Sequence, residues 1–217
     1  MSTRTTVVLA FVMIAAAVIL SLGFYSRMPE QVASHWNVDD QVDGTMPRFW
    51  GAFLMPLITL VMLGLFLLLP LIDPMKANIA AFRRPFNAFI ALIVAFMLYL
   101  HVLTTLWNLG LQSFRMSTAL LPALGLLFIF VGVMLRHAKR NFSIGIRTPW
   151  TLASDRVWDK THRLGAPLFV ASGALAALGA IFPGPVAYWF VFGPVLASTL
   201  FLLVYSYVLW RDEQTGA

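Results

Sequence analysis

The stretch TVVLAFVMIAAAVILSLGF, Thr6–Phe24, carries no charged side chain from end to end. Its length matches the ~20 apolar residues that an α-helix needs to cross the hydrocarbon core of a bilayer. It is longer than the apolar part of a secretory signal peptide, and no small-residue cleavage site closes it before Tyr25 and Arg27. We therefore expect a retained first transmembrane helix.

Five further apolar runs follow along the chain, and Pro183–Pro185 separates the last two by a tight turn. Hydrophobic residues make up 60% of the chain and charged residues 11%, against about 25% charged residues in an ordinary soluble domain. Because backbone groups in lipid must be satisfied within the element, these runs favour helices. We predict an all-α polytopic membrane protein, a bundle of six transmembrane helices with a short interfacial helix in the fourth loop. The five further runs are Phe49–Ile72, Phe86–Trp107, Ala119–Leu135, Leu164–Phe182 and Val186–Trp210.

The basic residues predict the orientation of this bundle. All but three of the 15 Lys and Arg residues fall at the two termini or in the second and fourth loops, the exceptions being Arg27, Arg48 and Arg115. Because cytoplasmic segments carry the excess of Lys and Arg, both termini are expected in the cytoplasm. The predicted location is the bacterial cytoplasmic (inner) membrane, in contact with membrane lipids.

The residue types exclude several kinds of chemistry. The absence of cysteine rules out disulfides and thiolate metal sites. There is no nucleophile elbow, phosphate-binding glycine loop or HExxH. We therefore expect no enzyme, no catalytic residue, no cofactor, no bound metal and no direct contact with nucleic acid. A weaker alternative is an enzyme at the membrane interface, acting on lipid or peptide, with His162 and Asp155 or Asp159 as an acid–base pair.

The outer segment 26–48 is acidic and amphipathic. Its charged residues are Glu30, Asp39, Asp40 and Asp43 against Arg27 and Arg48. His35 and the aspartates could bind a divalent cation, but their spacing matches no recognised ligand pattern, and a plain solvated loop is a further reading. We favour a docking surface for a partner or peptide. Its candidate residues are His35, Trp36, Asn37 and Asp43.

The inner segment 136–163 concentrates unusual residues. Ser154 is a good N-cap for a short helix with a basic face of Arg156, Lys160 and Arg163. That helix could simply lie at the headgroup level, but the density of Gly, Pro, Trp and His exceeds what anchoring needs. The functional candidates are Asn141, Gly145, Arg147, Thr148, Pro149, Trp150, Trp158, Thr161, His162 and Arg163.

Two spans contain features of their own. In the fifth span Gly173 and Ala177 have the small-xxx-small spacing that permits close helix approach, so we expect this helix to be the most buried. In the third span His101 is an ionisable residue at membrane depth, with Thr104, Thr105 and Asn108 on the same face. It is either a substrate or proton site or a neutral histidine bonded between helices.

The segment NFSIGIRTPWTLASDRVWDKTHR, Asn141–Arg163, resembles the signature of the SdpI-type toxin-immunity membrane proteins. The outer segment is similar to a domain of uncharacterised function that often precedes that signature. The matching outer residues are Pro29, His35, Trp36, Asn37, Asp43 and Gly44. Two features depart from the pattern: Asp39-Asp40 stands where that domain tends to have glycine, and Gly132-Val133 stands where members often have Gly-Asn.

The resemblance implies immunity to a secreted peptide toxin that meets the outer face, with a relay to a cytoplasmic repressor. It also implies two domains. Residues 1–72 would hold the first two spans and the outer segment 26–48, and residues 73–217 a four-helix region with the inner segment 136–163. The alternative to immunity, besides the interfacial enzyme, is a small-solute transporter or exporter that uses His101.

Overall fold

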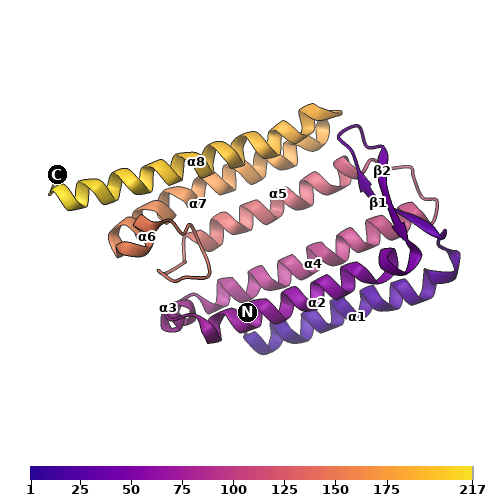
Figure 1. Ribbon diagram of the computed structural model, residues 1–217, viewed down its shortest axis with the longest axis horizontal. Helices are drawn as coiled ribbons and strands as arrows, with labels where there is room; N and C mark the ends of the chain where they lie inside the picture. The colour runs from indigo at the N-terminus through magenta and orange to yellow at the C-terminus, as the bar shows by residue number, and fades with distance from the viewer. Residues whose placement is uncertain (217) are drawn as a thin grey trace.

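The computed structural model describes residues 1–216 and is almost entirely helical (Figure 1). Within these residues, six helices are long and apolar enough to cross a membrane, which confirms the predicted bundle. They are α1 (Thr3–Phe24), α2 (Arg48–Ile72), α4 (Arg83–Asn108), α5 (Met116–Leu135), α7 (Asp155–Leu178) and α8 (Pro185–Thr215). The shorter elements are α3 (Lys76–Ala81), α6 (Pro149–Ala153) and the 3-10 turns Tyr25–Arg27 and Gly179–Ile181.

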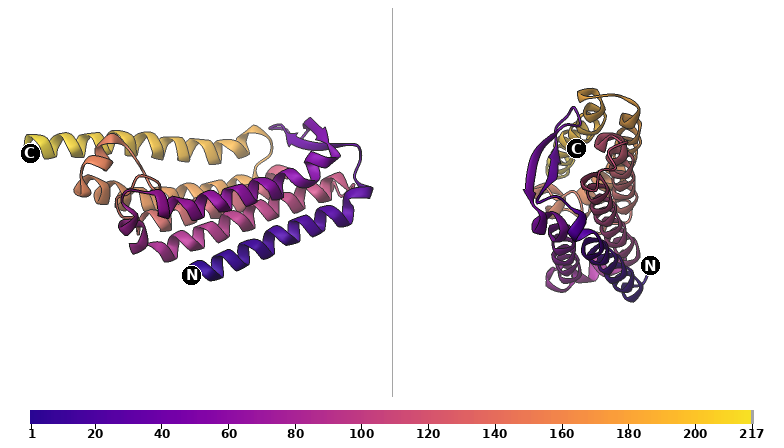
Figure 2. Two further views of the ribbon diagram at one scale, coloured as in Figure 1. Left: turned by 60° about the horizontal axis from the view of Figure 1, so that its bottom comes forward. Right: turned by 90° about the vertical axis from the view of Figure 1, so that its right-hand side faces the viewer.

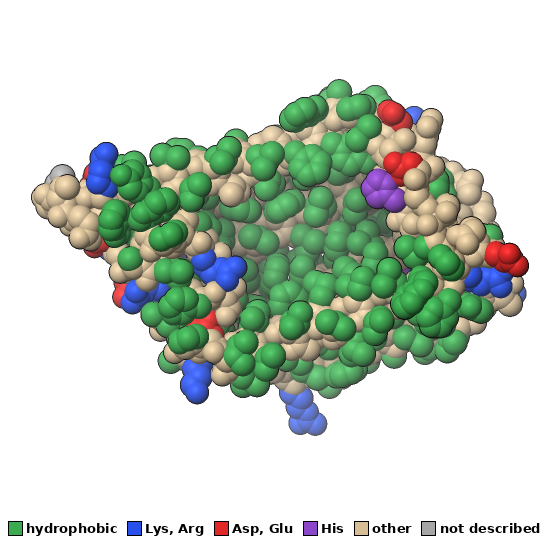
Figure 3. Space-filling view, viewed as in Figure 1, with side chains coloured by type: hydrophobic (Ala, Val, Ile, Leu, Met, Phe, Trp, Pro, Cys, Tyr) green, Lys and Arg blue, Asp and Glu red, His purple; other side chains and the backbone are tan. Residues whose placement is uncertain are grey.

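The six long helices form two groups of three. Helix α4 packs mainly against α1 and α2, whereas α7 packs against α5 and α8. Figures 1 and 2 show the two groups side by side, with α4 next to α5. The groups leave a hollow lined by hydrophobic side chains between them (Figure 3). Where α2, α4 and α5 meet the segment Ser143–Ile146, this hollow deepens into a crevice of about 280 Å³.

Helices α5 and α7 touch along their backbones because glycines face each other. A Cβ added to Gly173 would lie 2.4 Å from the carbonyl oxygen of Gly125, and one added to Gly125 would lie 2.9 Å from the backbone nitrogen of Ala177. The close approach predicted for Gly173 and Ala177 is thus confirmed. The buried share of residues is the same in α5 and α7 and is larger there than in the other four spans. The fifth span, α7, is therefore one of the two most buried helices, and α5 is the other.

The outer segment forms a β-hairpin, which the sequence analysis did not predict. Strands β1 (Gln31–Trp36) and β2 (Val42–Pro47) pair antiparallel. The Asn37 side chain closes the turn, because its Oδ1 accepts hydrogen bonds from the backbone N–H groups of Asp39 (2.9 Å) and Gln41 (3.0 Å). A lone two-stranded hairpin is marginally stable in water, so contacts with the helices must support it.

Asn108, at the end of α4, provides such a contact. Its Oδ1 accepts from the Ala33 N–H (2.7 Å), and its Nδ2 donates to the Ala33 carbonyl (3.0 Å). The carboxamide therefore occupies the place of a third strand at the free edge of β1. Edge strands need such covering, since their unpaired backbone groups otherwise invite other chains.

The short helix of the fourth loop differs in position from the prediction. Ser154 is an N-cap as expected and accepts from the Val157 N–H (3.3 Å). The helix it starts does not stop at Arg163 but runs on into the apolar fifth span as α7, with Pro167 accommodated inside. The separate short helix is α6, capped by Thr148 and Thr151 in a reciprocal capping box.

Candidate functional site: the inner loop and its anchors

Asn141 is the template around which the inner loop 136–154 folds. It is fully buried (0% exposed). Its Oδ1 accepts from the N–H groups of Ser143 (2.8 Å) and Ile144 (2.6 Å), and its Nδ2 donates to the carbonyls of Lys139 (2.7 Å) and Ile144 (2.9 Å). All four hydrogen bonds are local, so this side chain specifies the turn itself.

Gly145, Trp158 and His162 form the next layer. The Trp158 and His162 rings stack with centroids 4.0 Å apart, and both residues are buried. Trp158 Nε1 donates to the Ala138 carbonyl (2.9 Å). Gly145 adopts φ +124° and packs so closely that an added Cβ would lie 2.5 Å from His162 Nε2. Only glycine fits this backbone shape and this space.

Both ring nitrogens of His162 are occupied by backbone groups. Nε2 accepts from the Ile146 N–H (2.9 Å), and Nδ1 donates to the Trp158 carbonyl (2.9 Å). This pattern requires the neutral ring with its proton on Nδ1. His162, which is 2% exposed, holds the loop against α7 through its hydrogen bond to Ile146.

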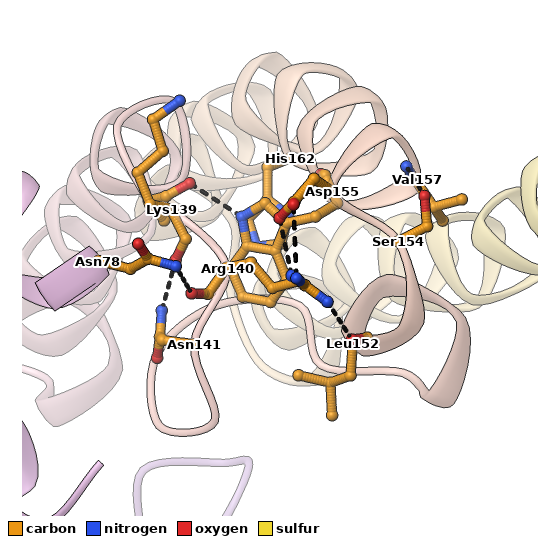
Figure 4. Close-up of polar contacts among 11 residues, drawn as sticks. Asn78, Lys139, Arg140, Asn141, Leu152, Ser154, Asp155, Val157 and His162 are labelled. Carbon is orange, nitrogen blue, oxygen red and sulfur yellow. Dashed lines mark hydrogen bonds and ion pairs between the residues drawn. The ribbon is translucent and has the colours of Figure 1, made fainter. Parts of the chain in front are cut away.

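The acid–base pair considered for His162 is not assembled. Asp155 instead forms an ion pair with Arg140, with 2.7 Å between Asp155 Oδ1 and Arg140 Nε (Figure 4). Arg140 also donates to the Leu152 carbonyl (2.8 Å) and accepts at its own carbonyl from Asn78 Nδ2 (2.7 Å). Arg140 thus joins the loop to α3 and to the start of α7.

Asp73 anchors the loop to the end of α2. This buried carboxylate accepts from the Phe142 N–H (3.0 Å) and the Ser143 hydroxyl (2.5 Å), and also from the Met75 N–H (2.7 Å). Asp73 was not among the predicted site residues, because a carboxylate at a span end is ordinary. The signal available was its position directly before Pro74, at a sharp change of chain direction.

Apart from the half-buried Gly145, the predicted residues of the inner segment divide into two sets. The buried set holds the loop together and comprises Asn141, Thr148, Trp158, Thr161 and His162. The surface set comprises the exposed Arg147, Pro149 and Arg163 and the half-buried Trp150, whose ring lies 5.1 Å from that of Tyr207. Arg147 donates to the Phe142 carbonyl (2.6 Å), which holds its guanidinium over the loop. Only the second set is placed to contact a partner.

The role of Asn141 can be measured directly. Asn141→Ala removes four hydrogen bonds and leaves the Ile144 N–H buried without its acceptor, so we expect the free energy of unfolding to fall by about 2 kcal/mol. Thermal unfolding of the detergent-purified protein measures this. Asn37→Ala is the matched control, because Asn37 closes a turn in the same way on the exposed hairpin. Equal losses for the two variants would contradict the assigned role.

The outer candidates lie on the hairpin and do not assemble a cation site. Asp43 pairs with His35 (Oδ1 to Nδ1, 2.5 Å), and Trp36 packs edge-on against Trp107 with centroids 5.7 Å apart. Within residues 1–216, no group of three or more His or acidic side chains could hold a metal ion. The cation reading of this segment is therefore not supported by its geometry.

Asp40 caps α5 from the tip of the hairpin. Helix α5 has no side-chain cap from its own N-cap residue, Arg115. Asp40 supplies one, because its carboxylate accepts from the Ser117 N–H (2.7 Å) and from the Ser117 hydroxyl (2.5 Å). Asp40 itself adopts φ +60° to reach this position. An outer carboxylate on one helix group thus anchors the other group, as Asp73 does at the opposite end.

His101 links three helices within the bundle. It is 1% exposed, and its Nε2 lies 2.9 Å from the Ser21 hydroxyl on α1. Ser21 in turn donates to the Ala52 carbonyl on α2 (2.5 Å). The geometry matches the interhelical reading. Asn108, which the sequence placed on the same face as His101, instead bonds to the backbone of Ala33 in the hairpin.

The matches to known proteins agree with the family resemblance of the segment Asn141–Arg163. Residues 137–206 match the SdpI/YfhL protein family, and residues 12–60 match a domain of unknown function (DUF1648). The chain is 23% identical over 177 residues to Immunity protein SdpI of Bacillus subtilis (strain 168), an alignment that covers 82% of each chain. No solved structure matches the chain. The resemblance found in the sequence is therefore confirmed.

Proposed function

We propose that this chain, with its SdpI/YfhL-family region over the inner loop, α7 and most of α8, is a non-enzymatic immunity protein that protects a bacterial cell from a secreted peptide toxin. The similarity to Immunity protein SdpI, which extends over most of both chains, supports this proposal. This similarity is the observation that carries the proposal. The two carboxylate anchors, Asp40 at the hairpin end and Asp73 at the loop end, connect the helix groups through which a signal would pass.

The hairpin is the toxin-facing surface in this proposal. Strand β1 is covered by Asn108, whereas no helix contributes such a cover to β2 among the described side-chain hydrogen bonds. Val38 (46% exposed) and Val42 (38% exposed) add apolar surface beside the His35–Asp43 pair. An extended peptide could therefore pair with β2 and bury its apolar side chains against these valines.

A route for the relay leads through α5 and α7. Displacement of the hairpin tip would pull Asp40 from the start of α5, and α5 touches α7 backbone to backbone. The first turns of α7 carry Trp158 and His162, which hold the inner loop. The exposed Arg147 and Arg163 would then meet a cytoplasmic repressor. This orientation, with both termini on the cytoplasmic side of the bacterial inner membrane, rests on the distribution of Lys and Arg.

Complementation tests the proposal. Bacillus subtilis cells that lack their own Immunity protein SdpI are exposed to the toxin against which that protein acts, with and without this chain. We expect this chain to restore survival, and Asp40→Ala to reduce it because the hairpin loses its anchor on α5. Asp39→Ala is the matched control, because the Asp39 carboxylate has no side-chain hydrogen bond in the described structure.

Membrane levels of each variant are compared by immunoblot, so that loss of protection is separated from loss of protein. If Asp40→Ala inserts normally and protects as well as the unaltered chain, the hairpin anchor has no part in immunity. If the unaltered chain inserts and gives no protection, the proposed function is wrong for this toxin class.

A further inference from the structure

A polar pocket of about 390 Å³ lies where α1 and α4 begin, at the same end of the bundle as the inner loop (Figure 1). It belongs to neither set of loop residues and lies outside the route described for immunity. The residues that line it are Met1, Ser2, Thr3, Arg83, Arg84 and Asn87.

The charges around this pocket are positive. Arg84 is exposed, and Arg83 is half-buried, with its Nε donating to the Thr3 hydroxyl (3.3 Å) and its guanidinium 5.8 Å from the centre of the Phe86 ring. None of the described lining residues is acidic. Two long helices also start here, and helix N-termini add partial positive charge and free N–H groups. The pocket therefore favours an anion.

Asn87 gives a second, independent indication of a ligand. It is 1% exposed and lines the pocket. Its Nδ2 donates to the Met1 carbonyl (3.2 Å) and the Thr3 hydroxyl (3.1 Å), whereas its Oδ1 has no partner among the described residues. A buried acceptor without a donor costs free energy. A ligand that fits both features carries a phosphate for the arginines and a hydroxyl for Asn87 Oδ1.

We propose that this pocket binds the headgroup of an anionic phospholipid whose phosphodiester carries a hydroxylated alcohol, such as phosphatidylglycerol. The phosphate lies between Arg83 and Arg84, and the headgroup hydroxyl donates to Asn87. The apolar faces of α1 and α4 continue from the pocket into the bilayer, where the acyl chains lie. A soluble phosphate ester shares the headgroup chemistry but lacks these chains.

Native mass spectrometry of the full chain tests the site. The protein is released from nanodiscs of phosphatidylglycerol or of phosphatidylcholine, and retained lipid is counted. We expect retention of phosphatidylglycerol over phosphatidylcholine, and a roughly thirtyfold weaker affinity in Arg83→Gln/Arg84→Gln, the factor that two charges at an anionic surface contribute. Arg136→Gln/Lys139→Gln removes equal charge from exposed positions at the same end and is expected to keep the site.

Glycerol 3-phosphate is added as the soluble competitor. If glycerol 3-phosphate displaces phosphatidylglycerol when both are present at the same concentration, the ligand is a free phosphate ester and the lipid assignment is overturned. Equal losses in the two double variants would show a diffuse charge effect and overturn the site. If the Arg83→Gln/Arg84→Gln variant fails to fold, the unaltered protein decides, because equal retention of both phospholipids contradicts the proposal.

Discussion

Gly145→Ala is expected to lower the free energy of unfolding by about 3–5 kcal/mol and to abolish protection. Three effects add. The φ of +124° is strained for any residue with a Cβ, at about 1–2 kcal/mol. The new methyl would lie 2.5 Å from His162 Nε2, so the ring must move. That movement breaks the hydrogen bond from the Ile146 N–H and leaves a donor unsatisfied, at about 1–3 kcal/mol.

Gly110→Ala is the control for Gly145→Ala. Gly110 also has positive φ (+94°), but a Cβ there meets nothing within 4 Å. The Gly110→Ala variant therefore has backbone strain like that of Gly145→Ala, but its new methyl group meets no other atom. Thermal unfolding measures both variants. If the two substitutions cost the same, the contact with His162 does not define the loop.

Gly173→Ala is expected to separate α5 from α7 and to cost about 3 kcal/mol, the upper part of the usual range for overpacking. The added Cβ would lie 2.4 Å from the Gly125 carbonyl oxygen and 2.6 Å from the Ile129 nitrogen. Both are backbone atoms, so no side chain can turn away and the helices must move apart. Cysteines introduced into α5 and α7 at the hairpin end of the bundle would report the change as a lower yield of cross-linked protein.

Gly193→Ala in α8 is the matched control for Gly173→Ala. A Cβ on Gly193 meets nothing within 4 Å, and alanine raises helix propensity there. We expect its unfolding temperature to stay the same or to rise. A Gly173→Ala protein that unfolds like Gly193→Ala would show that the α5–α7 contact tolerates a methyl group.

The long helices were predictable from the sequence because hydropathy alone selects them. Five of the six apolar runs appear as helices within five residues of their expected bounds, and Gly184 (φ +57°) makes the turn expected at Pro183–Pro185. Lipid solvation acts on each run separately, so distant residues are not needed. A helix was expected after Ser154, but its continuity with the fifth span was missed because the polar start of α7 does not enter the apolar pattern.

The hairpin could not be predicted in the same way. Neither strand alternates clearly between apolar and polar residues, and the cover of β1 is a carboxamide 75 residues away in sequence. The same limit applies to the inner loop. The density of Gly, Pro, Trp and His identified the inner segment as a candidate site. The burial of Trp158 and His162, however, depends on the loop closing over α7, which cannot be inferred from composition.

The anchors of the hairpin have a consequence for biosynthesis. The hairpin lies between the first two spans, yet its partners Asn108 and Ser117 are 75 and 77 residues from Ala33 and Asp40. At ~5–20 residues per second, the ribosome needs about 4–15 s to synthesise the intervening chain. During that interval the hairpin exists without these partners. Its β1 edge is uncovered until Asn108 has been made, so the hairpin gains both anchors only after α4 and the start of α5 have been synthesised.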